Sequence, residues 1–220
     1  SALVLGAPPA EKPKERPRGA LWPFLLAVGL YTGLEGALAT WNRVWLEALG
    51  HATALGGLLL TLYWLFLALG RLLLAGRVAK DPLRALRGLL LGVMGLLLLN
   101  FLPQTALLFP LAGFLLGPLF STLFALVQAR FGHRALGGLM YAGAAGSTLI
   151  PGLFALLPDR GIPLGLFALS LALYLLLRGA ERAVQGPVHV PDHAGDRLVH
   201  PDAEDLPGLA REGRVGPPAL

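Results

Sequence analysis

One acidic side chain lies deep inside an apolar segment of this chain. Glu35 stands about midway along the first long apolar stretch, and Tyr31 precedes it by one helical turn. A carboxylate at such depth in hydrocarbon is costly, so it is usually turned toward a cavity or a partner. Further polar side chains extend the strip along the same helix: Thr32, Thr40, Trp41 and Asn42. We therefore expect this strip to line a solute path, with Glu35 as hydrogen-bond acceptor or proton carrier.

A structural role for Glu35 is the alternative. In that case the carboxylate pairs with a hydroxyl or a basic group of a neighbour outside this chain, or extends outward toward water. The second apolar stretch carries Tyr63, Trp64 and Arg71. We expect the two aromatic rings to pack in the core or to face lipid. Arg71 is expected to contact helix ends or a lipid phosphate near the end of its helix.

The residue types that many enzymes need are missing from the apolar stretches. No histidine lies in them, which argues against a serine nucleophile with a histidine base inside the membrane. The chain has no cysteine, so thiolate metal sites and cysteine nucleophiles are excluded. No GxxxxGKS loop for ATP hydrolysis occurs either. We therefore expect no enzymatic activity, no metal and no cofactor.

Composition predicts the elements that position these residues. Of 220 residues, 55% are hydrophobic and 14% are charged, against about 25% charged in a soluble domain, and the mean hydropathy is +0.65. The apolar residues form continuous blocks long enough for helices to cross about 30 Å of hydrocarbon. The sequence therefore predicts an all-α integral membrane protein with six transmembrane helices in a lipid bilayer. The expected spans are 21–45, 53–76, 86–102, 105–128, 136–157 and 162–178.

Positive charges gather in alternate connections between these spans. Twelve Lys and Arg residues fall on one side, whereas only Arg43 and Arg160 fall on the other. The basic side is expected to be cytoplasmic, and an even number of spans places both termini there, in the cytoplasmic (inner) membrane. The net charge of +5 thus reflects topology and not a nucleic-acid surface.

The chain divides into three parts by composition. Residues 1–20 are expected to hold the end of a preceding helix and a charged, proline-rich cytoplasmic linker. Residues 21–182 are the six-helix bundle, and 183–220 are expected to form a disordered cytoplasmic tail.

Glycine and proline are frequent inside the spans. Three glycine pairs have a spacing of four, which places both members on one helix face and lets another backbone approach closely: Gly29 and Gly33, Gly88 and Gly92, Gly113 and Gly117. We expect these faces to be helix contacts. Pro110, Pro118 and Pro151 are expected to kink the fourth and fifth spans, because proline lacks a backbone donor.

Over roughly residues 1–182 the chain resembles the C-terminal six-helix half of major facilitator superfamily (MFS) transporters. GFLLGPLFSTLFALVQARFG resembles the family's helix ten, and YWLFLALGRLLLAGRVAKDPLRALR its helix eight with the following loop. The first span resembles helix seven through Tyr31, Gly33, Glu35 and Trp41. With Trp64 and the Gly70-Arg71 pair added, the pattern is also similar to sugar permeases of the fucose type.

The family's cytoplasmic loop motif, G-x-L-A-D-R-x-G-R-K, is matched in part. Gly76, Val78, Ala79 and Arg84 fit it, whereas Lys80 replaces the acidic residue and Leu83 the second glycine. These departures weaken the charge-relay gating role that the resemblance would imply. The candidate loop residues are Gly76, Arg77, Lys80, Asp81 and Arg84.

The resemblance implies secondary active transport of a small polar solute by alternating access, with no nucleic acid involved. Two six-helix bundles would enclose the site, and each bundle would be two inverted three-helix repeats. This chain supplies one bundle, so its partner would be an N-terminal half or a second copy. The first and fourth spans should line the cavity, through Tyr31, Glu35, Trp41, Asn42, Gly117, Ser121 and Thr122. The alternative is a non-transporting six-helix membrane subunit or a degenerate transporter remnant.

Overall fold

The computed structural model describes residues 20–185, and these residues are helical apart from short connections. The predicted linker and tail lie outside the described residues, except for Ala20 and residues 183–185. The last three are helical, so the predicted end of the sixth span at 178 and the predicted start of the tail at 183 are wrong. The elements in chain order are α1 (Trp22–Ala48), α2 (Thr53–Val78), α3 (Pro82–Leu99), α4 (Pro103–Ala106), α5 (Pro110–Phe131), α6 (Arg134–Phe154), the 3-10 turn η1 (Asp159–Gly161) and α7 (Ile162–Gln185).

Local capping explains where the helices differ from the predicted spans. The carboxylate of Asp81 accepts a hydrogen bond from the backbone N–H of Arg84 (3.4 Å), and Pro82 occupies the first turn, so α3 begins before the predicted residue 86. Pro110 likewise opens α5, where its missing N–H would have no helical partner. The kink predicted at Pro110 and the predicted start at 105 are therefore wrong. Pro118 does lie inside α5, as Pro151 does inside α6.

Five of the described helical segments are long and apolar enough to cross a membrane: α1, α2, α3, α5 and the segment from Asp159 to Arg182. The chain is therefore an all-helical, multi-pass type of membrane protein by length and composition. The remaining long helix, α6, has the length of a span but is rich in glycine and also contains Ser147 and Thr148, which lower its hydropathy.

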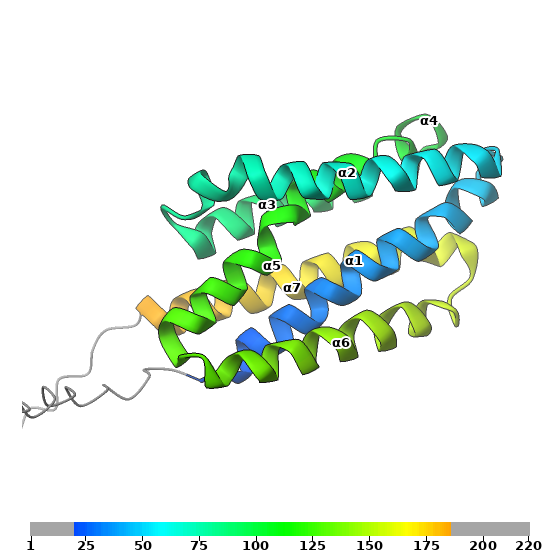
Figure 1. Ribbon diagram of the computed structural model, residues 1–220. Coiled ribbons are helices and arrows are strands. Elements are labelled where there is room, and N and C mark those ends of the chain that lie inside the picture. The colour runs from blue at the N-terminus through cyan, green and yellow to red at the C-terminus, as the bar shows by residue number, and fades with distance from the viewer. Residues whose placement is uncertain (1–19, 186–220) are drawn as a thin grey trace, which may run out of the picture. The chain divides into compact units, whose positions relative to one another are not determined.

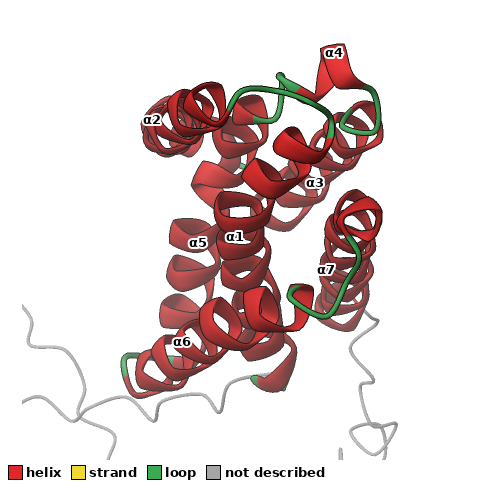
Figure 2. Cartoon of the chain, turned by 90° about the vertical axis from the view of Figure 1, so that its right-hand side faces the viewer, coloured by secondary structure: helices red, strands yellow, loops and turns green. Residues whose placement is uncertain are grey.

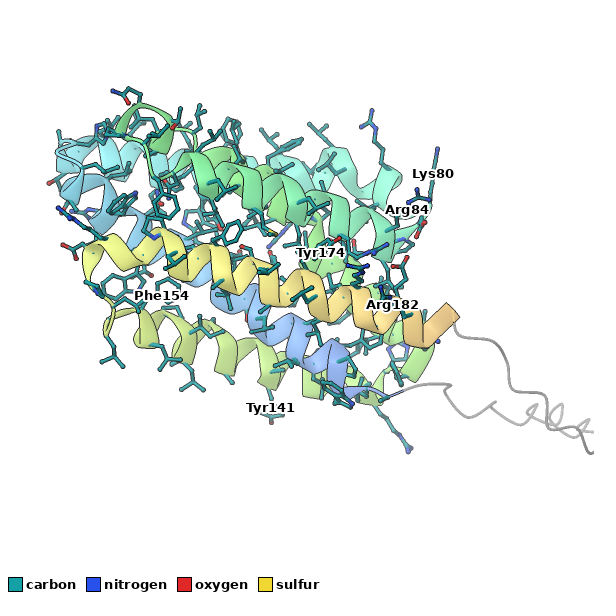
Figure 3. The ribbon with its side chains drawn as sticks, turned by 180° about the vertical axis from the view of Figure 1, so that it is seen from behind. Lys80, Arg84, Tyr141, Phe154, Tyr174 and Arg182 are labelled. Carbon is teal, nitrogen blue, oxygen red and sulfur yellow. The ribbon has the colours of Figure 1, made fainter. Side chains whose placement is uncertain are left out.

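The long helices form a bundle in which neighbours in space are far apart in sequence. The most extensive contacts join α1 to α6 and α2 to α5, while α7 packs against α1 and α3. Viewed down the bundle, α1 and α5 lie in the middle with the other long helices around them (Figure 2). α1 begins and α7 ends at the same end of the bundle (Figure 1). We call it the basic end, because Lys80, Arg84 and Arg182 lie there (Figure 3).

Glycine permits the two most extensive contacts. A Cβ atom on Gly146 of α6 would meet the backbone of Gly29 on α1, and one on Gly70 of α2 would meet the carbonyl of Phe114 on α5. A Cβ on Gly117 would likewise meet the backbone of α2. The contacts predicted for the pairs in the first and fourth spans are thus confirmed. Of the glycine pair in the third span, only a Cβ on Gly92 would meet another residue, the side chain of Leu115. A Cβ on Gly88 would meet no atom within 4 Å, so the contact predicted for that glycine is not present.

Substitution at these contacts should separate the helices. We expect Gly70→Leu to lower the free energy of unfolding by about 1–3 kcal/mol or more, because the new side chain has to displace the backbone of α5. Gly57→Leu on the same helix is the matched control, since a Cβ there meets no atom within 4 Å. Thermal unfolding of both variants in one detergent tests this, and equal melting temperatures would refute the packing argument.

Candidate functional site

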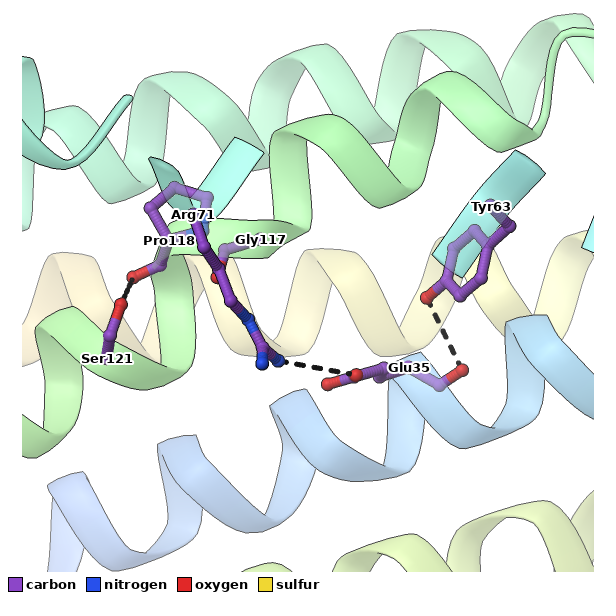
Figure 4. A network of polar contacts seen from close by, with 6 residues as sticks. All are labelled: Glu35, Tyr63, Arg71, Gly117, Pro118 and Ser121. Atoms are coloured by element: carbon purple, nitrogen blue, oxygen red, sulfur yellow. Dashed lines mark hydrogen bonds and ion pairs between the residues drawn. The ribbon is translucent and has the colours of Figure 1, made fainter. Parts of the chain in front are cut away.

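A charge pair joins α1 to α2 in the middle of the bundle. Glu35 is the central residue of α1, and one of its carboxylate oxygens, Oε1, lies 3.7 Å from Nη2 of Arg71 on α2 (Figure 4). The side chain of Glu35 is only 14% exposed, whereas that of Arg71 is 44% exposed. The carboxylate is thus mostly enclosed by helices, and the cation lies partly open on the surface of this bundle.

The same arginine also holds α5. Its Nε donates a hydrogen bond to the backbone carbonyl of Gly117 (3.2 Å). The close approach of α5 to α2 at Gly117 brings this carbonyl within reach, and Pro118 follows it in the helix. Arg71 therefore connects three helices through one side chain, a task suited to a guanidinium because its donors point in several directions.

Two tyrosines complete the surroundings of Glu35. The hydroxyl of Tyr63 on α2 makes a long hydrogen bond to the backbone carbonyl of Glu35 (3.5 Å). Tyr31, one turn before Glu35, is fully buried, and its hydroxyl lies near both Glu35 and Arg71 without a hydrogen bond of good geometry. A buried hydroxyl without a partner is uncommon, because burial removes its hydrogen bonds to water. The site therefore brings together a carboxylate, a guanidinium cation and a buried hydroxyl without a hydrogen-bond partner.

The structure brings together three of the residues predicted to line the path: Tyr31, Glu35 and Gly117. Trp41 instead donates its indole N–H to the carbonyl of Pro151 on α6 (2.8 Å). Asn42 is fully buried and accepts a hydrogen bond from the side chain of Asn100 (2.7 Å). In this structure both residues therefore fasten α1 to neighbouring segments, away from the charge pair.

The remaining predicted residues lie nearer the basic end. Ser121 donates to the carbonyl of Pro118 (3.1 Å), and with Thr122 it lines a cavity of about 360 Å³ between α2 and α5. The loop candidates are all exposed: Gly76 and Arg77 on the last turns of α2, Lys80 and Asp81 in the turn, and Arg84 at the start of α3. Figure 3 shows Lys80 and Arg84 at the same end of the bundle as Arg182.

Sequence reasoning misplaced Arg71. It was expected to contact helix ends or lipid phosphate, but it reaches across to Glu35 and to the α5 backbone. Arg71 is also the basic partner of Glu35. The alternative prediction of a structural role had placed that partner outside this chain. The signal for this pairing was available, because opposite charges inside apolar helices usually pair with one another. Both charges of the pair are visible in the sequence, whereas their distance is not.

Among residues 20–185 no group of three or more His, Asp or Glu side chains is placed to hold a metal ion. Comparison with protein-family models, with curated proteins and with solved structures finds no match to this chain.

The asymmetry of the charge pair predicts unequal effects of removing its members. Arg71→Gln should destabilise the protein by about 1–3 kcal/mol more than Glu35→Gln, because it leaves a mostly buried carboxylate without its cation. In Glu35→Gln the arginine is nearly half exposed and keeps the Gly117 carbonyl.

Thermal unfolding of both single variants and of the double variant measures the difference. The double variant should lose less than the sum of the two single losses, since the two side chains interact. A larger loss in Glu35→Gln than in Arg71→Gln would contradict this reading of the site.

Proposed function

We propose that this chain is one half of an MFS-type secondary transporter that moves a small polar solute across the cytoplasmic membrane by alternating access. In this proposal α1, α2 and α3 form one inverted repeat and α5, α6 and α7 the other, with α6 as the sixth span. The partner is a second six-helix bundle, either an N-terminal half or a second copy.

The observation that carries the proposal is the partial exposure of Arg71 beside Glu35. A charge open to hydrocarbon in the middle of a helical bundle is costly, so such residues usually face a water-filled cavity or a protein partner. Both conditions are met if a second bundle covers this side of the chain and encloses water and solute between the two. The charge pair, Tyr31 and the Gly117 carbonyl then supply hydrogen-bond donors and acceptors for a polar solute.

The helix pair α1 and α6 has an apolar surface on one side and a polar surface on the other, which supports a cavity on the side of Glu35. On one side lies an apolar groove of about 480 Å³, lined among others by Leu26, Ala145 and Leu149. Helical spacing places Glu35 and Ser147 on the other side, where Ser147 is exposed. The apolar side suits lipid, and the polar side suits the cavity.

The pattern of helix contacts supports the repeat assignment. Exchanging α1, α2 and α3 for α5, α6 and α7 turns the α1–α6 contact into the α5–α2 contact, and both are the most extensive in the bundle. The same exchange relates α1–α7 to α5–α3 and α1–α2 to α5–α6, all of which are present. Equivalent contacts in the two halves are expected of inverted repeats.

Charge at the two ends supports the proposed topology. The basic end carries eight Lys and Arg residues in the described chain, namely Arg77, Lys80, Arg84, Arg87, Arg130, Arg134, Arg178 and Arg182. Two acidic residues, Asp81 and Glu181, accompany them there. The opposite end holds equal numbers of both signs. The basic end is therefore assigned to the cytoplasm.

A cysteine-labelling experiment tests the orientation of the polar side. The chain has no native cysteine, so single cysteines can be placed at Ser147 and at Ala145, two exposed positions on α6 at nearly the same depth. We expect a membrane-impermeant maleimide to label Ser147→Cys through the aqueous cavity. Ala145→Cys should stay unlabelled, because it faces the apolar groove. Equal labelling, or the reverse order, would remove the support for a cavity on this side.

Transport itself is tested at Glu35. In cells that carry the native assembly, Glu35→Gln should alter solute uptake without changing the amount of protein in the membrane. Glu47→Gln is the matched control on the same helix: Glu47 is exposed and pairs with Arg43 near the opposite end. Unchanged uptake in Glu35→Gln would remove Glu35 from the mechanism. Absence of any solute flux, with the partner bundle present, would favour the non-transporting subunit.

A further inference from the structure

A second concave site lies at the basic end, away from the charge pair. The start of α1, the last turns of α5 and the last turns of α7 surround a groove of about 420 Å³. This volume falls within the range of small-molecule sites, roughly 300–1,000 Å³. Among the residues that line it are Trp22, Phe24, Arg130, Phe131, Leu176 and Gly179.

The groove is apolar except at one point. Of the described residues that line it, Arg130 is the only one with a charged side chain. Trp22 is 62% exposed at the entrance, and an exposed indole at a helix end is typical of the boundary between hydrocarbon and lipid headgroups. The groove thus combines a surface suited to hydrocarbon with a cation at headgroup depth.

Charges around the groove favour an anionic occupant. Arg134, Arg178 and Arg182 are exposed at the same end of the bundle. The acid nearest along α7, Glu181, forms an ion pair with Arg87 of α3, which reduces its repulsion of an anion. Basic sites of this kind between transmembrane helices bind the headgroups of anionic lipids.

We propose that this groove binds an anionic phospholipid. An acyl chain lies against Phe24, Phe131 and Leu176, and the phosphate pairs with Arg130. Gly179 leaves room for the chain, since a Cβ at this position would meet no atom within 4 Å. This groove is separate from the proposed solute path. The lipid proposal therefore does not depend on whether the protein transports a solute.

Native mass spectrometry of the full chain in a neutral detergent tests the proposal. Phosphatidylglycerol and phosphatidylcholine with identical acyl chains are supplied in equal amounts, and the retained lipids are counted. We expect preferential retention of phosphatidylglycerol. Arg130→Gln should weaken it about five-fold, the usual contribution of one cation near an anionic lipid. Arg84→Gln, which removes an exposed cation of α3 outside the groove, is the matched control and should weaken it less.

A second variant pair separates the groove from its charge. Gly179→Leu should fill the groove and abolish the preference, while Gly88→Leu, also at an open helical position near the basic end, should leave it intact. Equal retention of both lipids by the unmodified chain would overturn the proposal, as would equal effects of Arg130→Gln and Arg84→Gln. Displacement of the lipid by excess inorganic phosphate would show a simple anion site and would also overturn it.

Discussion

The close approach of two pairs of helix backbones is the constraint on which the remaining structure depends. Gly70 and Gly117 let α2 and α5 touch without intervening side chains, and Gly29 and Gly146 do the same for α1 and α6. In an apolar solvent helices gain little from burying hydrocarbon, so van der Waals contact at small residues has to stabilise the bundle. Because α1 and α5 also contact each other, they lie in the centre of the bundle (Figure 2).

The charge pair is a result of that packing. Arg71 follows Gly70 directly, so the contact that brings α5 against α2 also places the guanidinium beside the Gly117 carbonyl. From there it reaches Glu35 on α1. One short stretch of α2 thus supplies both the contact that joins two helices and the cation that joins them to a third. A displacement of α2 relative to α5 would therefore change helix packing and charge pairing together.

The sequence predicted the helices well and the site only in part. Hydropathy alone located all six long helices, because continuous apolar blocks are a local signal, although their ends differ from the predicted ones by up to seven residues. It also singled out Glu35 and Tyr31, since polar groups inside apolar segments are conspicuous. It did not give Arg71 its partner, nor show that Asn42 pairs with Asn100, because these contacts join residues from distant segments. Such distances depend on which helices pack together, and spacing along one helix contains no information about that.

The composition of α6 bears on how the chain is made. Rich in glycine and containing Ser147, Thr148 and Pro151, α6 is the one long helix of the described chain that is not apolar enough to count among the candidate membrane spans, so it gains less free energy from entering lipid. Its companion α1 is made before it, and α6 follows only after α2, α3 and α5. The ribosome therefore delivers α6 when the surface of α1 that receives it already exists. Insertion of α6 is in this sense also a folding step, because its close contact with α1 at Gly29 and Gly146 adds to what it gains from lipid.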